Sequence, residues 1–163
     1  MVAFLYRMAA GIPGDVTRAE SADVAPGNYD SSAPFPAYGL PGKFVAGKFV
    51  PVGAGDTAAV VAGVLVRPFP TQSSQNALGA AVPPTSGHCN VLRRGRISIL
   101  LGGTAPAVKG GTVYVRIAAP AAGKPIGGFE AAADSTNTIA LPATTTFAGP
   151  ADAGAVTELE FNI

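Results

Sequence analysis

The residues best suited to chemistry in this chain are the neighbours His88 and Cys89, its one histidine and its one cysteine. A cysteine nucleophile needs a histidine base within hydrogen-bond reach, whereas adjacent residues on a strand point to opposite faces. A metal centre needs three or four such ligands, and a single cysteine forms no intrachain disulfide. The pair therefore predicts neither a catalytic centre nor a metal site, and Cys89 is expected to be a small buried apolar residue.

Two glycine-rich stretches imitate nucleotide-binding loops. Residues 42–49 (GKFVAGKF) nearly spell a phosphate-binding loop, but Phe49 stands where a Ser or Thr would hold Mg²⁺. Residues 53–58 (GAGDTA) imitate a dinucleotide fingerprint, yet β-branched residues follow where a helix is needed, and no acidic residue occurs between Asp56 and Glu130. We predict a turn at the second stretch, no cofactor and no enzymatic activity. The repeat of Gly-Lys-Phe-Val within the first stretch is interpreted as chance.

The composition indicates which elements carry these residues. The 163 residues include 21 Gly and 15 Pro, and only 13% are charged. Gly and Pro disfavour helices by roughly 1 and 3 kcal/mol each, which excludes a helical bundle, and the 48% hydrophobic content excludes a disordered chain. A charge-poor, apolar surface is typical of a subunit that is covered in a larger assembly.

The net charge of +1 gives no electrostatic case for nucleic acid or an anionic membrane as a partner. The apolar run at the start is interrupted at Arg7, short of the roughly 7–15 apolar residues of a signal peptide. No apolar run approaches the roughly 18 residues of a membrane span. We therefore expect synthesis in a cytoplasm and no membrane partner.

Glycine and proline turns separate short segments with strand patterns, which predicts one mainly β domain over residues 43–163 with a β-sandwich, jelly-roll or barrel-like core. The alternation is clearest in residues 157–163, and in Val113, Val115 and Ile117, which share one face. A hairpin turn is expected at residues 53–56 and a long loop at 71–90. The predicted strands cover residues 43–52, 58–67, 91–101, 112–118, 127–133, 137–141, 144–147 and 157–163.

Residues 1–42 are rich in Gly and Pro and show no sustained period, which predicts an extended N-terminal arm. The arm is either a flexible leader or an ordered segment that lies across this subunit or a neighbour. Phe35, Tyr38 and Leu40 stand among its prolines, and prolines reduce the entropy lost on docking. These three residues are therefore candidates for an interface.

Charge is segregated along the chain. Residues 57–129 hold seven basic side chains and no acid, whereas residues 130–163 hold five acids and no base. This predicts pairing of opposite charges within the fold, across one sheet or between subunits. The basic cluster near residue 95 is solvated or ion-paired, contacts an acidic protein surface, or binds nucleic acid. The charged candidates for an interface are Arg93, Arg94, Arg96, Arg116, Glu158 and Glu160.

Seven pieces of the sequence, in a fixed order, cover almost the whole chain. They are AGIPGDVTR (10–18), PAYGLPG (36–42), VAGVLVRPFPT (61–71), VLRRG (91–95), KGGTVYVR (109–116), IGGFEAA (126–132) and EFNI (160–163). Taken together, they resemble the structural cement, or decoration, proteins of tailed-bacteriophage capsids.

The resemblance implies a β-rich protein that binds the outside of the assembled head and clamps neighbouring major capsid subunits. It implies the major capsid protein and further copies of the chain, as a homodimer or homotrimer, as partners. The implied location is the exterior of the virion capsid, after assembly in the bacterial cytoplasm, and no catalytic residues are implied. The alternative from the residues alone is another virion protein, such as a tail or fibre component or a host-binding β-sandwich.

Overall fold

The structure is a computed structural model and describes residues 11–68 and 82–163. Its regular elements in these residues are short strands and three-residue 3-10 turns, apart from one strand of fifteen residues. The predicted mainly β fold is confirmed. The elements are η1 (Ala19–Ser21), β1 (Asp23–Asn28), β2 (Pro41–Val45), β3 (Lys48–Pro51), η2 (Ala58–Val60), β4 (Gly63–Val66), β5 (His88–Gly102), β6 (Tyr114–Arg116), β7 (Phe129–Glu130), η3 (Ser135–Asn137), β8 (Thr138–Ala140), β9 (Thr146–Phe147) and β10 (Val156–Asn162).

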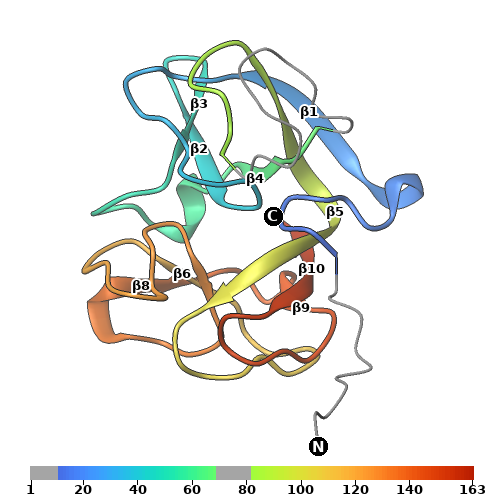
Figure 1. The fold of residues 1–163 in the computed structure, drawn as a ribbon, viewed down its shortest axis with the longest axis vertical. Helices are drawn as coiled ribbons and strands as arrows, with labels where there is room; N and C mark the ends of the chain where they lie inside the picture. The colour runs from blue at the N-terminus through green and yellow to red at the C-terminus, as the bar shows by residue number, and fades with distance from the viewer. Residues whose placement is uncertain (1–10, 69–81) are drawn as a thin grey trace, which may run out of the picture.

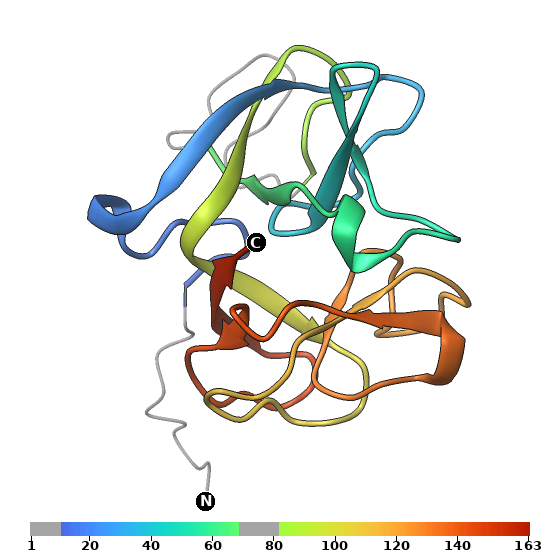
Figure 2. The same ribbon diagram turned by 180° about the vertical axis from the view of Figure 1, so that it is seen from behind.

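The long strand β5 organises the molecule. It runs from an upper lobe, which holds β1 to β4, into a lower lobe, which holds β6 to β10 (Figures 1 and 2). Strands β1, β4 and β10 pair with it antiparallel, and β7 pairs with its end in parallel. On the far side of β4 lies β2, which pairs with both β4 and β3. On the far side of β7 lies β6, which pairs with both β7 and β8. The strands of the described residues therefore form one hydrogen-bonded sheet around β5.

Strands β4 and β5 separate two apolar clusters because their side chains alternate between two covered faces. Leu65 and Val91 face one cluster, whereas Val64 and Leu92 face the other, and all four residues of β4 are buried. This gives the molecule a sandwich-like core. The aromatic cluster consists of Tyr29, Phe35, Tyr38, Leu40, Phe49, Leu65, Cys89 and Val91. The main core includes Val64, Leu92, Ile97, Ile99, Leu101, Val113, Val115, Phe129, Phe147, Leu159 and Phe161.

The described part of the predicted arm, residues 11–42, lies across this subunit. Residues 14–17 extend along β5: the Gly14 amide donates to the Ser98 carbonyl at 2.8 Å and the Thr17 amide to the Arg96 carbonyl at 3.0 Å. Strand β1 continues the pairing toward the start of β5. These residues thus lie against their own subunit, and residues 1–10 lie outside the described residues.

The prediction of one strand over residues 43–52 is wrong. Strands β2 and β3 form a hairpin in which Phe44 lies opposite Phe49 and Val45 opposite Lys48. The connecting residues Ala46 and Gly47 have φ angles of 49° and 78°, which is the left-handed geometry of a two-residue hairpin turn. The two copies of Gly-Lys-Phe-Val thus lie in opposite arms of one hairpin.

Most other predicted strands exist but are shorter than expected. The predicted strand over residues 58–67 is divided into η2 and β4, and the one over residues 112–118 is reduced to β6. The loop predicted over residues 71–90 ends earlier, because β5 already begins at His88, and residues 71–81 lie outside the described residues.

The last strand follows its predicted alternation for most of its length. Thr157, Leu159 and Phe161 are at most 1% exposed, whereas Glu160 on the other face is exposed. The prediction is wrong for Ile163, which is 44% exposed because β10 ends one residue before it. No helix in the described ranges is long and apolar enough to cross a bilayer.

Candidate interface

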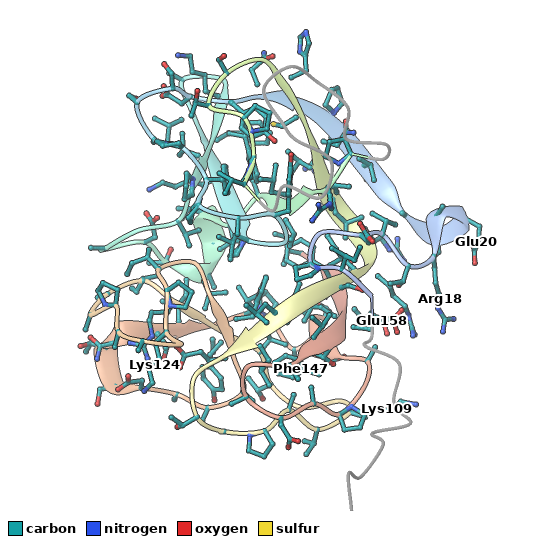
Figure 3. All side chains as sticks on the ribbon, in the orientation of Figure 1. Arg18, Glu20, Lys109, Lys124, Phe147 and Glu158 are labelled. Atoms are coloured by element: carbon teal, nitrogen blue, oxygen red, sulfur yellow. The ribbon has the colours of Figure 1, made fainter. Side chains whose placement is uncertain are left out.

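A ladder of charges connects β5 with β10 on the surface of the sheet. The antiparallel register places Arg96 opposite Glu160, and its guanidinium reaches the Glu160 carboxylate at 2.9 Å and that of Glu158 at 3.4 Å. Thr17 donates a hydrogen bond to Glu158, and Arg18 approaches the same carboxylate at 4.0 Å (Figure 3). The predicted pairing of basic and acidic segments across one sheet is confirmed here. Partly exposed pairs of this kind contribute up to about 1 kcal/mol each.

A second ion cluster is enclosed within the lower lobe. The Arg116 side chain is 1% exposed, and its Nε donates to Glu130 at 2.5 Å. One terminal nitrogen donates to the carbonyls of Ala118 and Ala119, both at 3.2 Å. The other donates to Glu130 at 3.2 Å and to Asp134 at 2.6 Å. All five donors of this guanidinium are therefore matched by acceptors, as burial of a charge requires.

The electrostatics of this cluster are those of a structural ion network. Hydrogen bonds from Arg116 hold the pKa of Asp134 below its usual range, and hydrogen bonds to Glu130 raise the pKa of Arg116. Lys124 lies 3.7 Å from the Asp134 carboxylate. General acid catalysis needs a carboxyl group whose pKa is raised, so the lowered pKa of Asp134 does not suit that role.

The predicted pair His88 and Cys89 is divided between two faces of β5. His88 is exposed, whereas Cys89 is 5% exposed within the aromatic cluster, as predicted for neighbours on a strand. Burial raises the pKa of the Cys89 thiol to about 11, so the thiol stays protonated at neutral pH and is a poor nucleophile. Burial also raises the pKa of Tyr29, which belongs to the same cluster.

The turn predicted at residues 53–56 is present, but the prediction of a hairpin there is wrong, because the flanking strands β3 and β4 both pair with β2. The Gly53 amide donates to the Asp56 carboxylate at 2.7 Å, and the Lys43 ammonium reaches the same carboxylate at 2.6 Å. Asp56 therefore stabilises the turn through its side chain. No group of three or more possible metal ligands occurs in the part of the chain that the structure describes.

The nine interface candidates fall into two groups. Phe35, Tyr38 and Leu40 are at most 9% exposed, and the Phe35 ring stacks on Phe49 with centroids 5.1 Å apart. Together with Arg116, these side chains are largely enclosed by the subunit itself and support its fold, although Tyr38 and Leu40 also line the apolar groove described below. The candidates that reach the surface are Arg93, Arg94, Arg96, Glu158 and Glu160.

Arg93 and Arg94 differ from Arg96 because they are exposed and take no part in the ion pairs of the described residues. Arg94 lies opposite Asp23 on one side and Asn162 on the other. The register between β1 and β5 shifts at this point and leaves Arg93 without an opposite residue in β1. Within the basic cluster of residues 93–96, Arg93 and Arg94 are therefore the side chains available to a partner.

An apolar groove of about 710 Å³ lies where the N-terminal segment meets the end of β5. Its rim includes Ile12 and Leu100, which are 51% and 50% exposed. Sequence reasoning missed this groove because its walls come from distant segments that share no pattern. The apolar groove is lined by Ile12, Pro13, Pro36, Leu100, Pro125 and Gly154, among others.

The described residues define a β-rich subunit in which the buried charges, Arg116 and Glu130, pair with each other, and in which an apolar groove and the side chains of Arg93 and Arg94 are accessible. The chain matches the XM1 gp53 minor capsid protein family over residues 1–161, and it belongs to that family. The family assignment makes it a phage capsid-associated protein and gives it a place in the virion.

A solved structure described as "The capsid of Myoviridae Phage XM1" contains a chain with a similar fold. The TM-score is 0.70 at 20% sequence identity, and the match covers 98% of this chain and 95% of that one. At this identity the likeness establishes the fold. No curated protein matches the sequence.

Proposed function

We propose that this protein is a cement protein, which binds the outer surface of the assembled head and clamps neighbouring major capsid subunits. The observation that carries the proposal is the match to a minor capsid protein family over residues 1–161. The fold shared with a chain of the phage XM1 capsid supports it.

The surface of the subunit suits such a role. Only 13% of the residues are charged, and Phe44, Val45 and Val108 are between 43% and 62% exposed. Apolar surface with few long charged side chains is inexpensive to desolvate in a lasting contact. Many copies bound to one shell also gain from multivalency, because each copy ties together subunits that would otherwise separate.

The test uses heads assembled without this protein. Purified protein added to them should bind to saturation, in many copies per head, and should raise the temperature at which packaged DNA is released. Quantitative mass spectrometry measures the copy number, and a DNA-binding dye measures release. Binding of a few copies at the tail would instead support the tail or fibre alternative, and no binding to heads would reject the cement function.

Arg93 is the proposed contact with an acidic surface of the shell, because it is exposed and outside the ion pairs described above. Arg93→Glu should raise the dissociation constant for heads about tenfold, which corresponds to about 1.4 kcal/mol. Lys109→Glu makes the same change of charge at an exposed position of the lower lobe and should bind like the wild type (Figure 3). Equal losses in the two variants would show general attraction and contradict a contact at Arg93.

A further inference from the structure

We propose that the apolar groove of one subunit receives the hairpin tip of a second copy of this chain, where the hairpin tip is the end of the β2–β3 hairpin, residues 44–47. This contact joins free subunits, so it stands or fails separately from binding to the capsid. Four observations carry it: the apolar surface of the tip, the matching surface of the groove, the distance between the two within one subunit, and the charges beside them.

The hairpin tip is apolar on both of its faces. Its four residues carry no polar side chain, and all four are exposed. Phe44 and Val45 are neighbours on a strand and point to opposite faces, yet they are 43% and 49% exposed. A group of exposed apolar side chains at the end of a hairpin marks a surface for contact.

The tip is held in place by the upper lobe and keeps an unfavourable turn. The Phe44 ring lies over Gly27 of β1, and its centroid is 5.3 Å from that of Phe49. Ala46 has a φ of 49°, at a position where asparagine or glycine is the usual residue. Asparagine would relieve the strain but would place an amide on the tip, which is costly in an apolar contact. A tip ordered in advance also loses little conformational entropy on binding.

The apolar groove offers a concave surface of matching chemistry. Its volume of about 710 Å³ lies within the roughly 300–1,000 Å³ of pockets that enclose a ligand. Ile12 and Leu100 remain half exposed on its rim, and Pro125 adds apolar surface from the lower lobe. A seated tip would remove the apolar side chains of both surfaces from water at once.

The tip of a subunit is remote from the groove of the same subunit. Leu40 lines the groove, and β2 begins at the next residue and leads away from it to the tip. Five residues of strand span roughly 17 Å, so the length of β2 separates the two surfaces. Figure 1 shows the β2–β3 hairpin in the upper lobe and the end of β5 in the lower lobe. Another copy is therefore needed to bring a tip to the groove.

The charges beside the two surfaces are opposite in sign. Lys48 directly follows the tip; its side chain is 51% exposed, and its ammonium lies 3.5 Å from the Asp30 carboxylate. Asp152 directly precedes the groove residues Ala153 and Gly154, is exposed, and takes part in no ion pair of the described residues. This complementarity favours a second copy over an unrelated apolar segment as the occupant.

The oligomeric state of the purified full chain tests the contact. Sedimentation should show one oligomeric species for the wild type, with a copy number set by closure of the repeated contact. Val45→Glu on the tip and Leu100→Glu on the groove rim should each raise its dissociation constant at least about tenfold, because each buries a charge in the contact. Val108→Glu adds the same charge at a residue that is 62% exposed and outside both surfaces, and it should assemble like the wild type. Circular dichroism confirms that each variant is folded.

Ala46→Asn separates a role in the contact from a role in folding. Below the dissociation constant, the variant subunit should be at least as stable as the wild type, because asparagine tolerates the positive φ of the turn. The dissociation constant itself should nevertheless rise at least about fivefold, because the contact then buries an amide. A residue that served only the fold of the hairpin would not move these two quantities in opposite directions.

Crosslinking identifies the occupant of the groove. A tagged Val45→Cys chain and an untagged Leu100→Cys chain are mixed and treated with a short bis-maleimide, and a tagged–untagged adduct is expected. The matched control pairs Val45→Cys with Val108→Cys and should give none, and the buried Cys89 is a common background in all chains. A monomeric wild type, an oligomer unaffected by both Val45→Glu and Leu100→Glu, or the absence of the mixed adduct would overturn the proposal.

Discussion

Arg116 occupies a position at which a strand pattern alone would leave an exposed charge. Its neighbours Val113, Val115 and Ile117 are buried in the other direction, as predicted. Glu130 and Asp134 close over the guanidinium from the segment that follows β6, and the carbonyl of Ala119 reaches it from a residue with a φ of 48°. The local backbone thus adopts an unfavourable conformation at Ala119 where its carbonyl completes the set of acceptors.

We predict that Arg116→Met lowers the free energy of unfolding by about 3–5 kcal/mol, because Glu130 is then left as an unpaired buried charge. Glu130 is only 4% exposed, so water cannot replace the hydrogen-bond donors that Arg116 supplied. Urea unfolding followed by circular dichroism measures the change.

The control is the double variant Arg116→Met with Glu130→Met, which removes both buried charges and keeps apolar side chains of similar length. It should lose less stability than Arg116→Met alone, since a buried ion pair replaced by apolar residues is often nearly neutral. Additive losses from the two single substitutions would contradict a coupled pair.

The sequence predicts that the segregated charges pair, but it does not predict how. Arg96 could be matched with Glu158 and Glu160 only once β5 and β10 are known to be adjacent. Arg116 could not be matched with Glu130, because that contact depends on the antiparallel pairing of β6 with β7, which places Glu130 opposite Tyr114. Chain distance carries no information about either pairing.

At the scale of elements, the turn at Ala46 and Gly47 shows why one predicted strand is in fact two. An Ala-Gly pair is a weak turn signal, because alanine rarely adopts a positive φ and Asn-Gly is the preferred sequence for this hairpin. The stronger signal at residues 53–56 was correctly predicted as a turn, but it does not connect paired strands: β3 pairs with β2, and β2 pairs with β4. The glycine-rich turn at residues 53–56 could be predicted from sequence, whereas the turn at Ala46 and Gly47 and the order of the strands could not.

We predict that Ala46→Asn stabilises the protein by about 0.5–1 kcal/mol, because asparagine tolerates the observed φ of 49° better than alanine does. Both positions of the turn are exposed, so no packing contact is lost. Ala54→Asn is the matched control: Ala54 is an exposed turn residue without a positive φ, and no gain is expected there. Thermal unfolding of the two variants measures the difference, and equal shifts would refute a specific effect of backbone strain.

At the scale of the whole molecule, the apolar clusters meet at β5, and this bears on how the protein unfolds. Val91 and Leu92 are adjacent on this strand, yet one belongs to the aromatic cluster and the other to the main core. The alternation itself could be predicted from sequence. The existence of two clusters could not, because the aromatic cluster depends on residues 29–40, whose irregular backbone shows no period.

Because β5 is shared, the two lobes should unfold as one cooperative unit. Val91→Ala removes methyl groups only from the aromatic cluster and should cost about 1–3 kcal/mol. If unfolding is cooperative, the opening free energy measured by hydrogen exchange for the slowest amides in β6 and β8 should fall by the same amount. Those strands do not contact Val91, so a local effect would not reach them. The control is Val60→Ala, since Val60 is 43% exposed and its truncation should leave exchange in both lobes unchanged. Faster exchange confined to β2, β3 and β4 would instead show that the upper lobe opens by itself, and β5 would then hold together two units that fold independently.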